Sequence, residues 1–228
     1  MVFRQLFDPA SSTYTYLLAD EATREAVLID PVKEYAERDK ALLATLGLEL
    51  KYILETHVHA DHITGASALK ATTGAETVVP LDCGASGFDR TLVDGDQVRF
   101  GNETIRAIHT PGHTPGSMSY LWRDRVFTGD TLLIGGCGRA DFQKGDAHVL
   151  YRSITQKLFT LPDETLVFPG HDYKDRRVSC IGEEKATNPR LAGKSEAEFA
   201  DIMNKLDLAK PKRIDEAVPA NLLAGRDA

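Results

Sequence analysis

Potential metal ligands are concentrated in the stretch THVHADHITG, which runs from residue 56 to residue 65. Six consecutive residues contain four candidates, which are His57, His59, Asp61 and His62. In an extended segment, side chains two residues apart share a face, so His57, His59 and Asp61 would point the same way. We expect His62 to begin a turn into a helix. Imidazole and carboxylate groups at this spacing predict a metal site.

Three further candidate ligands share one sequence form, in which a β-like run ends in a turn that presents the ligand. They are His113 in IHTPGHTPGS, Asp130 in VFTGD and His171 in LVFPGHDY. A glycine directly precedes each of the three, as expected at a tight turn or a close backbone approach. A solitary histidine is usually structural or exposed, but this combination predicts a metal site at the ends of strands, where a rigid scaffold holds ligands accurately.

Composition limits the class of protein. The chain has 228 residues, of which 42% are hydrophobic and 27% charged, so we expect one large core and a single catalytic domain over residues 1–228. Its net charge of -7 argues against nucleic acid or an anionic membrane as a partner. The N-terminus lacks an export pattern, no apolar run is long enough to span a bilayer, and three sparse cysteines suit a reducing compartment, so we expect a cytoplasmic protein without disulfides.

Hydrophobic periodicity predicts strands and helices between the ligands. The expected strands and hairpins are residues 14–20, 25–31, 51–56, 76–81, 97–111, 117–133 and 165–170. The expected helices are residues 35–47, 63–74, 147–159 and 195–206, the last with a capping box from Ser195 and Glu198. The order predicts two β-rich halves whose sheets pack together with helices outside, and loops converging at one edge.

The motifs HVHADH, TPGHTPGS, FTGD and FPGHDY resemble those of the metallo-β-lactamase superfamily over nearly the whole chain. The resemblance implies an α/β fold, the four-layer αββα sandwich, with metal at one edge. In many relatives the counterparts of His57, His59 and His113 hold one metal and those of Asp61, His62 and His171 another, with that of Asp130 between them. All seven groups are present, so the ligand count leaves the number of metals open.

Further motifs narrow the family. TLLIGGCGRADFQKGDA, GHDYKDRRVSCIGEEKATNPRL and KPKRIDEAVPAN together resemble the persulfide dioxygenases, also called sulfur dioxygenases, from end to end. Hydroxyacylglutathione hydrolase, or glyoxalase II, is similar in the region after Asp130 but carries a longer helical C-terminal part. A di-zinc glutathione thioesterase of that type is therefore the alternative. A noncatalytic binding module of the same fold would typically have lost ligands, and this chain has lost none.

The persulfide dioxygenase resemblance implies one Fe(II) per chain, held by His57, His113 and Asp130. Two imidazoles and a carboxylate on one face leave open positions for substrate and dioxygen. The remaining candidates are then expected to surround the ligands without binding iron, and they are His59, Asp61, His62 and His171. The implied reaction converts glutathione persulfide, dioxygen and water into glutathione and sulfite, and needs no flavin, nicotinamide or ketoacid.

The same resemblance points to substrate contacts in the GCGRADF motif and in residues 172–228. We expect residues 172–228 to form a C-terminal substrate-pocket segment. Arg139 and Arg190 are candidates for the glutathione carboxylates, ahead of Arg176 and Arg177, and Tyr173 is a candidate hydroxyl donor near the sulfur.

Two further candidates in this region leave alternatives open. Cys137 either contacts the substrate or is a small buried hydrophobe, and Asp141 either orients Arg139 or is an exposed turn acid. We expect KPKR at residues 210–213 to be a solvated loop and AVPAN at residues 217–221 to close a pocket wall. Members of the family are often dimers, so the resemblance implies a homodimer, and no feature of the sequence shows one independently.

Overall fold

A computed structural model describes residues 1–226, which divide into two compact units. The first unit contains Met1–Leu92, Gln97–Ile105 and the described part of Lys210–Ala228. The second contains Val93–Asp96 and Arg106–Ala209. The prediction of a single catalytic domain stays a prediction.

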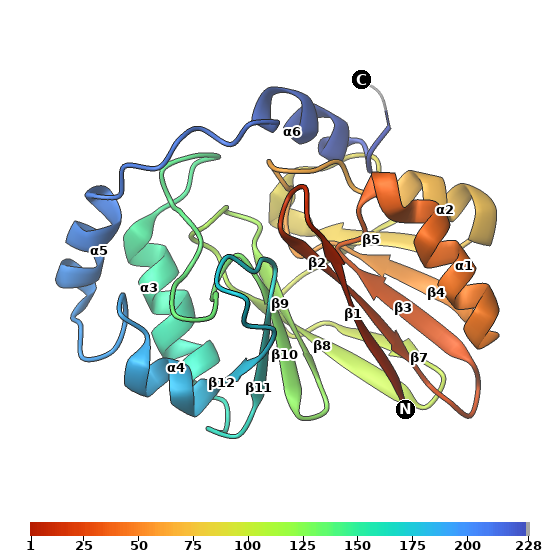
Figure 1. The fold of residues 1–228 in the computed structure, drawn as a ribbon, viewed down its shortest axis with the longest axis horizontal. Helices are drawn as coiled ribbons and strands as arrows, with labels where there is room; N and C mark the ends of the chain where they lie inside the picture. The colour runs from red at the N-terminus through yellow and green to blue at the C-terminus, as the bar shows by residue number, and fades with distance from the viewer. Residues whose placement is uncertain (227–228) are drawn as a thin grey trace. The chain divides into compact units, whose positions relative to one another are not determined.

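The first unit is built on a six-stranded mixed sheet of order β1-β2-β3-β4-β5-β6 (Figure 1). Its strands are β1 (Val2–Asp8), β2 (Thr13–Ala19), β3 (Glu25–Ile29), β4 (Glu49–Leu54), β5 (Glu76–Pro80) and β6 (Arg90–Leu92). Strands β1, β2 and β3 pair antiparallel with one another, whereas β3, β4, β5 and β6 pair in parallel. Parallel strands need crossover connections, which α1 (Ala36–Leu46) supplies between β3 and β4, and α2 (Ala66–Thr73) between β4 and β5.

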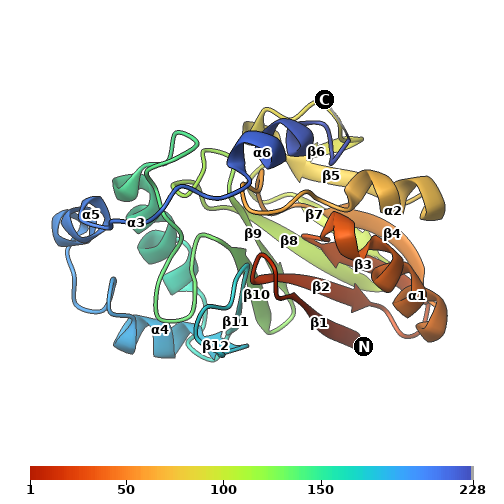
Figure 2. The same cartoon turned by 45° about the horizontal axis from the view of Figure 1, so that its top comes forward.

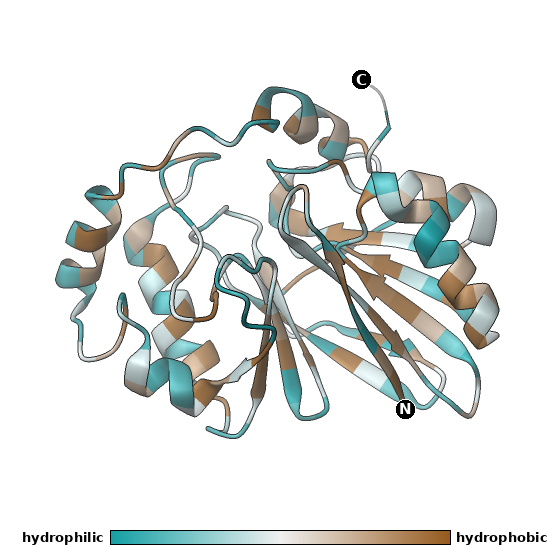
Figure 3. Cartoon of the chain, in the orientation of Figure 1, coloured by the Kyte–Doolittle hydropathy of each residue, from teal (hydrophilic) through white to brown (hydrophobic). Residues whose placement is uncertain are grey.

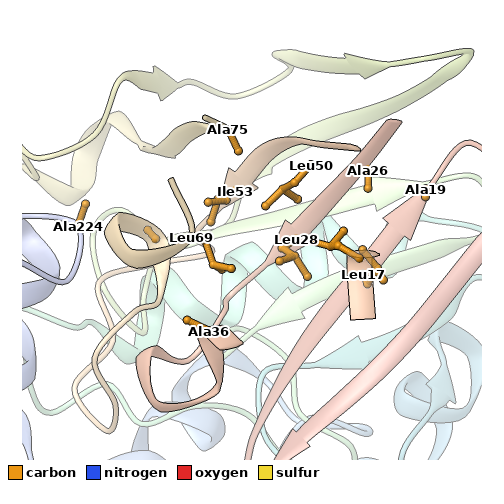
Figure 4. Close-up of a cluster of buried hydrophobic side chains, with 12 residues drawn as sticks. Leu17, Ala19, Ala26, Leu28, Ala36, Leu50, Ile53, Leu69, Ala75 and Ala224 are labelled. Carbon is orange, nitrogen blue, oxygen red and sulfur yellow. The ribbon is translucent and has the colours of Figure 1, made fainter. Parts of the chain in front are cut away.

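Helices α1 and α2 pack against one face of this sheet. The core between them contains Leu17 and Leu28 from strands, Leu43 from α1 and Leu69 from α2, all at most 4% exposed (Figure 4). Helix α1 ends at Leu46, and the positive φ of 61° at Gly47 gives it a left-handed C-cap. The unit also contains the short helices η1 (Lys33–Tyr35) and η2 (Leu81–Cys83), strand β7 (Gln97–Phe100) and helix α6 (Ile214–Leu222).

The second unit contains most of another six-stranded sheet, of order β12-β11-β10-β9-β8-β7, whose strand β8 (Glu103–His109) starts in the first unit. The other strands are β9 (Met118–Trp122), β10 (Arg125–Gly129), β11 (Leu166–Pro169) and β12 (Ser179–Cys180). The helices are α3 (Ala147–Gln156), η3 (Leu158–Thr160), α4 (Ile181–Thr187) and α5 (Glu196–Asn204), of which α3, α4 and α5 are labelled in Figure 2. Figure 3 shows alternating hydrophobic and polar residues along α3 and α5, and Leu150, Ile154 and Phe199 of these helices are buried in one cluster.

Most predicted elements are confirmed within a few residues, and so is the capping box, in which the hydroxyl of Ser195 and the carboxylate of Glu198 each accept the other residue's backbone N–H. The periodicity missed β1, β6, β12, α4 and α6, which are short, or partly exposed, or interrupted by Pro219 within α6. The three cysteines are free, as expected. Among residues 1–226, no helix combines the length and the apolar character that crossing a membrane requires.

Candidate metal centre

The loop after β4 carries the first group of predicted ligands, all within the first unit. Residues 55–64 form bends and irregular backbone, so the extended segment that the sequence suggested is wrong. The ring centroid of His59 lies 4.1 Å from that of His57 and 4.3 Å from that of His62. The three imidazoles are buried and Asp61 is half-buried, and the loop brings His62 as well as His57 next to His59.

Asp30, at the end of β3, fixes the start of this loop. Its carboxylate accepts hydrogen bonds from the backbone N–H and the hydroxyl of Thr56, both at 2.7 Å. Because the Thr56 hydroxyl donates to Asp30, it accepts from Nδ1–H of His57 at 3.0 Å. This tautomer puts the lone pair of His57 on Nε2, as a metal ligand requires.

His59 lies between two buried carboxylates. Its Nε2 is 3.1 Å from Oδ1 of Asp30 and 3.3 Å from Oε2 of Glu55, and the three side chains are at most 2% exposed. Burial lowers the pKa of His59, but the charges and hydrogen bonds of the two carboxylates outweigh burial and hold that pKa well above its usual value. Burial raises the pKa of Glu55, against the effect of His59. Nε2 of His59 is therefore committed to the two carboxylates.

Asp61 and His62 form a pair next to β2. Oδ2 of Asp61 accepts from the hydroxyl of Thr13 at 2.9 Å and lies 2.9 Å from Nδ1 of His62. Nε2 of His62 and Nδ1 of His59 are buried and have no hydrogen-bond partner within the described chain. A ligand atom from each of His59, Asp61 and His62 lies within 4.8 Å of the others. Buried imidazole nitrogens of this kind fit a cation or an ordered water nearby.

The second unit brings together His113, Asp130 and His171, as the sequence predicts. These residues follow β8, β10 and β11, and the parallel pairing of β10 with β11 places Asp130 and His171 at adjacent strand ends. Nε2 of His113 is 3.6 Å from Oδ2 of Asp130, and Nε2 of His171 is 3.4 Å from Oδ1 of Asp130. Both separations exceed an ordinary hydrogen bond and suit groups that face a shared cation.

The backbone around Asp130 is closely packed and fixes these side chains. Nδ1–H of His113 donates to the carbonyl of Arg139 at 2.6 Å, which puts its lone pair on Nε2. A Cβ added to Gly138 would lie 2.2 Å from the carbonyl oxygen of Asp130 and 3.0 Å from Nδ1 of His113. A Cβ at Gly170 would lie 2.6 Å from Oδ1 of Asp130. A Cβ at Gly138 would clash with the backbone of Asp130, and one at Gly170 would displace the Asp130 carboxylate, so both glycines help to hold the donor atoms in place.

A pocket wholly within the second unit contains several predicted substrate residues. Its lining comprises Leu133, Ile134, Gly135, Gly136, Cys137, His171, Asp172, Tyr173, Lys174, Arg176 and Arg190. The ring of Tyr173 stacks on His171, with centroids 5.4 Å apart, and its side chain is 68% exposed. The pocket therefore presents a phenol next to a candidate ligand and three cationic side chains.

Cys137 lies at the buried end of this lining. The guanidinium of Arg190 donates to its carbonyl at 2.7 Å, and its thiol donates to the sulfur of Met203 at 3.7 Å. Burial raises the pKa of Cys137 to about 11, although Arg190 opposes the shift. The thiol is protonated at neutral pH and belongs to the hydrophobic core of the second unit. This agrees with the interpretation of Cys137 as a small buried hydrophobe.

Arg139 lies outside the pocket lining and is engaged by its own chain. Its guanidinium donates to both carboxylate oxygens of Asp141, at 2.6 and 2.7 Å, and to the carbonyls of Ala209 and Leu208, at 2.7 and 3.2 Å. It also stacks on Phe142, with 4.5 Å to the ring centroid. Asp141 therefore orients Arg139, which was one of its two interpretations, and the pair fastens residues 208–209.

Three residues that support the ligand loop escaped the sequence analysis. Asp30 lies in the predicted strand that ends with LIDP, and Glu55 directly follows β4. Carboxylates at the adjacent ends of two parallel strands could therefore have been predicted from the sequence to lie near the ligand loop. Asn221 stands in AVPAN, which the sequence assigned to a pocket wall. It is 1% exposed in α6, and its amide donates to the carbonyls of His59 and His62.

Comparison with known proteins identifies a superfamily and, within it, a family. Residues 8–171 match the metallo-beta-lactamase superfamily. The chain is 49% identical over 228 residues to "Persulfide dioxygenase ETHE1, mitochondrial" of Bos taurus, covering 99% of this chain and 89% of that protein. It is 57% identical to the crystal structure of ETHE1 from Myxococcus xanthus, with a TM-score of 0.97 and coverage of 99% of this chain and 100% of that one.

A hydroxyacylglutathione hydrolase of Rhodospirillum rubrum is 40% identical over 174 residues, which cover 74% of this chain and 66% of that protein. That similarity is shorter and weaker than the similarity to the dioxygenases. The predicted fold class, an α/β sandwich of the metallo-β-lactamase type, is confirmed. The chain belongs to the metallo-β-lactamase superfamily and, within it, to the family of the persulfide dioxygenases.

Proposed function

We propose that this chain is a persulfide dioxygenase, an oxidoreductase that oxidises the sulfane sulfur of glutathione persulfide to sulfite with one Fe(II). The observation that carries the activity is the 49% identity to a named persulfide dioxygenase over nearly the full length of both proteins. The proposal also specifies that the metal is iron and that the thiol carrying the sulfane sulfur is glutathione.

His57, His113 and Asp130 would hold the iron. The support is chemical, because two imidazoles and one carboxylate are a ligand set of non-haem Fe(II) oxygenases. Thr56 fixes the tautomer of His57 and the carbonyl of Arg139 fixes that of His113, so each puts its lone pair on Nε2. When bound, Fe(II) would supply open coordination positions for dioxygen and a sulfur anion.

The other buried groups would tune this centre without binding the iron. His59 packs against His57, and His171 faces Asp130. Asp61 and His62 pair with each other, and His62 packs against His59. Groups of this kind orient ligands and set the charge around a metal.

The overall reaction balances without another cofactor. One glutathione persulfide, one dioxygen and one water give one glutathione, one sulfite and two protons. The sulfane sulfur, formally at oxidation state zero, loses four electrons to reach that of sulfite, and dioxygen accepts four. The chain therefore needs to bind the substrate, orient its terminal sulfur and exclude other reductants.

The pocket of the second unit supplies candidate groups for those tasks. Arg190, with Lys174 and Arg176 in the same lining, would bind the carboxylates of glutathione. Tyr173 would donate its hydroxyl near the reacting sulfur. Cys137, whose thiol is buried against Met203, would support the pocket only through the hydrogen bond from Arg190 to its carbonyl. Asp141 would contribute by orienting Arg139, and Arg139 would contribute by fastening residues 208–209.

Cytoplasmic location is also part of the proposal. Three free cysteines support a reducing compartment. The Bos taurus relative is named as mitochondrial, so fractionation of cells that produce this chain is the direct test. A homodimer remains a prediction that the sedimentation of the purified protein would check.

An oxygen electrode, with metals quantified on the same anaerobically purified sample, tests the activity. We expect about one iron per chain, as a single facial site requires, and oxygen uptake with glutathione persulfide. His57→Ala should abolish both, whereas His148→Ala, at an imidazole that is 51% exposed and distant in sequence from every candidate ligand, should change neither. Two zincs without iron, together with thioester hydrolysis and no oxygen uptake, would establish the glyoxalase II type instead.

A further inference from the structure

Asn221 makes three hydrogen bonds to the loop that carries His57. Its Nδ2 donates to the carbonyls of His59, at 2.9 Å, and of His62, at 2.8 Å. Its Oδ1 accepts from the backbone N–H of Thr64 at 2.8 Å. The side chain is 1% exposed, and both of its amide protons and its oxygen are engaged by this one loop.

The loop needs such a partner because it has little regular structure of its own. Between the end of β4 and the start of α2, only Thr64 takes part in an isolated bridge, with Val32. Buried backbone groups outside helices and sheets must find other partners, and a buried carbonyl left without one costs about 1–3 kcal/mol. Asn221 satisfies two carbonyls and one N–H across a sequence separation of 157 to 162 residues.

The helix that carries Asn221 is docked on the same loop by packing. Ala217 and Ala220 of α6 form a hydrophobic cluster with Ile63. After the helix, a Cβ at Gly225 would lie 2.2 Å from the carbonyl oxygen of Thr64, so the chain passes directly against the loop. The backbone N–H and hydroxyl of Ser67, at the start of α2, both donate to the carbonyl of Ala224. Asn221 is thus presented from a fixed helix.

We propose that Asn221 is a positioning residue for the metal centre, which fastens the C-terminal end of the ligand loop while Asp30 fastens its start. The inference rests on the proposed function only in taking His57 as an iron ligand. His57 lies between the two attachment points, Thr56 on Asp30 and His59 on Asn221, so its backbone is fixed on both sides.

The informative substitution is Asn221→Asp, which keeps the size of the side chain. One carboxylate oxygen still accepts from Thr64, but the other replaces the donor and faces the carbonyls of His59 and His62. We expect the loop to loosen and iron affinity to fall about 10- to 100-fold, as for other residues that orient metal ligands, which makes release to a chelator faster.

A general loss of stability would also speed metal release, so a control is needed. Leu69→Ala removes a buried side chain of α2 in the core of the same unit, 1% exposed in the native protein, and leaves the loop's hydrogen bonds intact. Both variants are compared with wild type at temperatures equally far below their own Tm. Hydrogen exchange of the amides in residues 57–64 is measured on the same metal-free samples.

Faster iron release and faster exchange in residues 57–64 for Asn221→Asp than for Leu69→Ala support the proposal. Equal release and equal exchange overturn it. If Asn221→Asp does not fold, Asn221→Ala removes the same three hydrogen bonds without adding a charge and carries the comparison. A wild-type protein that binds no iron would contradict the proposed function, while the exchange of residues 57–64 would still decide whether Asn221 holds the loop.

Discussion

The carboxylate of Asp30 accepts both the backbone N–H and the hydroxyl of Thr56, each at 2.7 Å, and so fixes the residue directly before His57. Asp30 is 1% exposed and lies at the end of β3, next to the parallel strand β4 that leads into the ligand loop. A buried carboxylate thus orients a candidate metal ligand through the backbone and through one hydroxyl, without contacting the metal in the proposed site.

We expect Asp30→Asn to destabilise the protein and to weaken metal retention. The new amide would face donors from Thr56 and His59, and breaking a buried charged network of this kind costs about 3 kcal/mol. Chemical denaturation and iron content measure the two effects. Asp141→Asn, at a carboxylate that is 51% exposed, is the control and should cost much less stability. Equal losses in the two variants would contradict the role of Asp30.

Gly138→Ala should remove iron from a folded protein. The added Cβ would lie 2.2 Å from the carbonyl oxygen of Asp130, so Asp130 or His113 must move. Gly136→Ala is a matched control, because a Cβ there meets nothing within 4 Å and no unusual φ opposes it. We expect the control to keep about one iron per chain in the proposed single site, and circular dichroism to confirm that both variants are folded. Normal iron in Gly138→Ala would show that Asp130 tolerates displacement.

Arg139→Ala should release the segment around residues 208–209. The guanidinium is the donor to the carbonyls of Leu208 and Ala209, and Asp141 holds that guanidinium in place. We expect limited proteolysis to cut near these residues in Arg139→Ala and, less readily, in Asp141→Ala. The double variant should be cut no faster than Arg139→Ala, because the two residues act as one unit. Additive rates would mean that they act independently.

Arg190→Ala should raise KM for glutathione persulfide while leaving iron content unchanged. Loss of one charged hydrogen bond to a substrate carboxylate corresponds to about a tenfold or larger rise in KM. Steady-state oxygen uptake and metal analysis separate the two quantities. Arg152→Ala, at a guanidinium on the outer side of α3 that pairs with Glu196, serves as the control and should leave KM unchanged. An unchanged KM in Arg190→Ala would remove that residue from the pocket.

Asp20 gives the first unit a pH-dependent contribution to stability. Hydrogen bonds from the backbone N–H groups of Asn102 and Ala22 lower the pKa of Asp20 to about 2, from an ordinary value of 3.8. Because the folded-state pKa is the lower one, the stabilisation is present above pH 3.8 and is lost as the pH falls towards 2. Asp20→Asn should therefore lower the Tm at pH 7, and its difference from wild type should shrink below pH 4. Thermal melts of metal-free protein check this, since a constant difference would contradict it.

The sequence by itself determined the positions of the candidate ligands and most of the elements that present them. Ligand spacing and hydrophobic periodicity are local properties, so His113, Asp130 and His171 could be placed after strands, and β8, β10 and β11 confirm that placement. The glycine before each of these ligands can also be read from the sequence, and a Cβ at Gly170 would lie 2.6 Å from Oδ1 of Asp130.

Only the tertiary structure decided what supports the ligands. Asp30 reaches Thr56 across 26 residues, Arg139 reaches Ala209 across 70, and Asn221 reaches His59 across 162. Such contacts depend on the register of parallel strands and on where a helix docks, and neither is encoded in the local pattern of residues. Whether Cys137 is exposed to a substrate or buried beside Met203 likewise follows from packing between distant segments, because burial is a property of the folded chain.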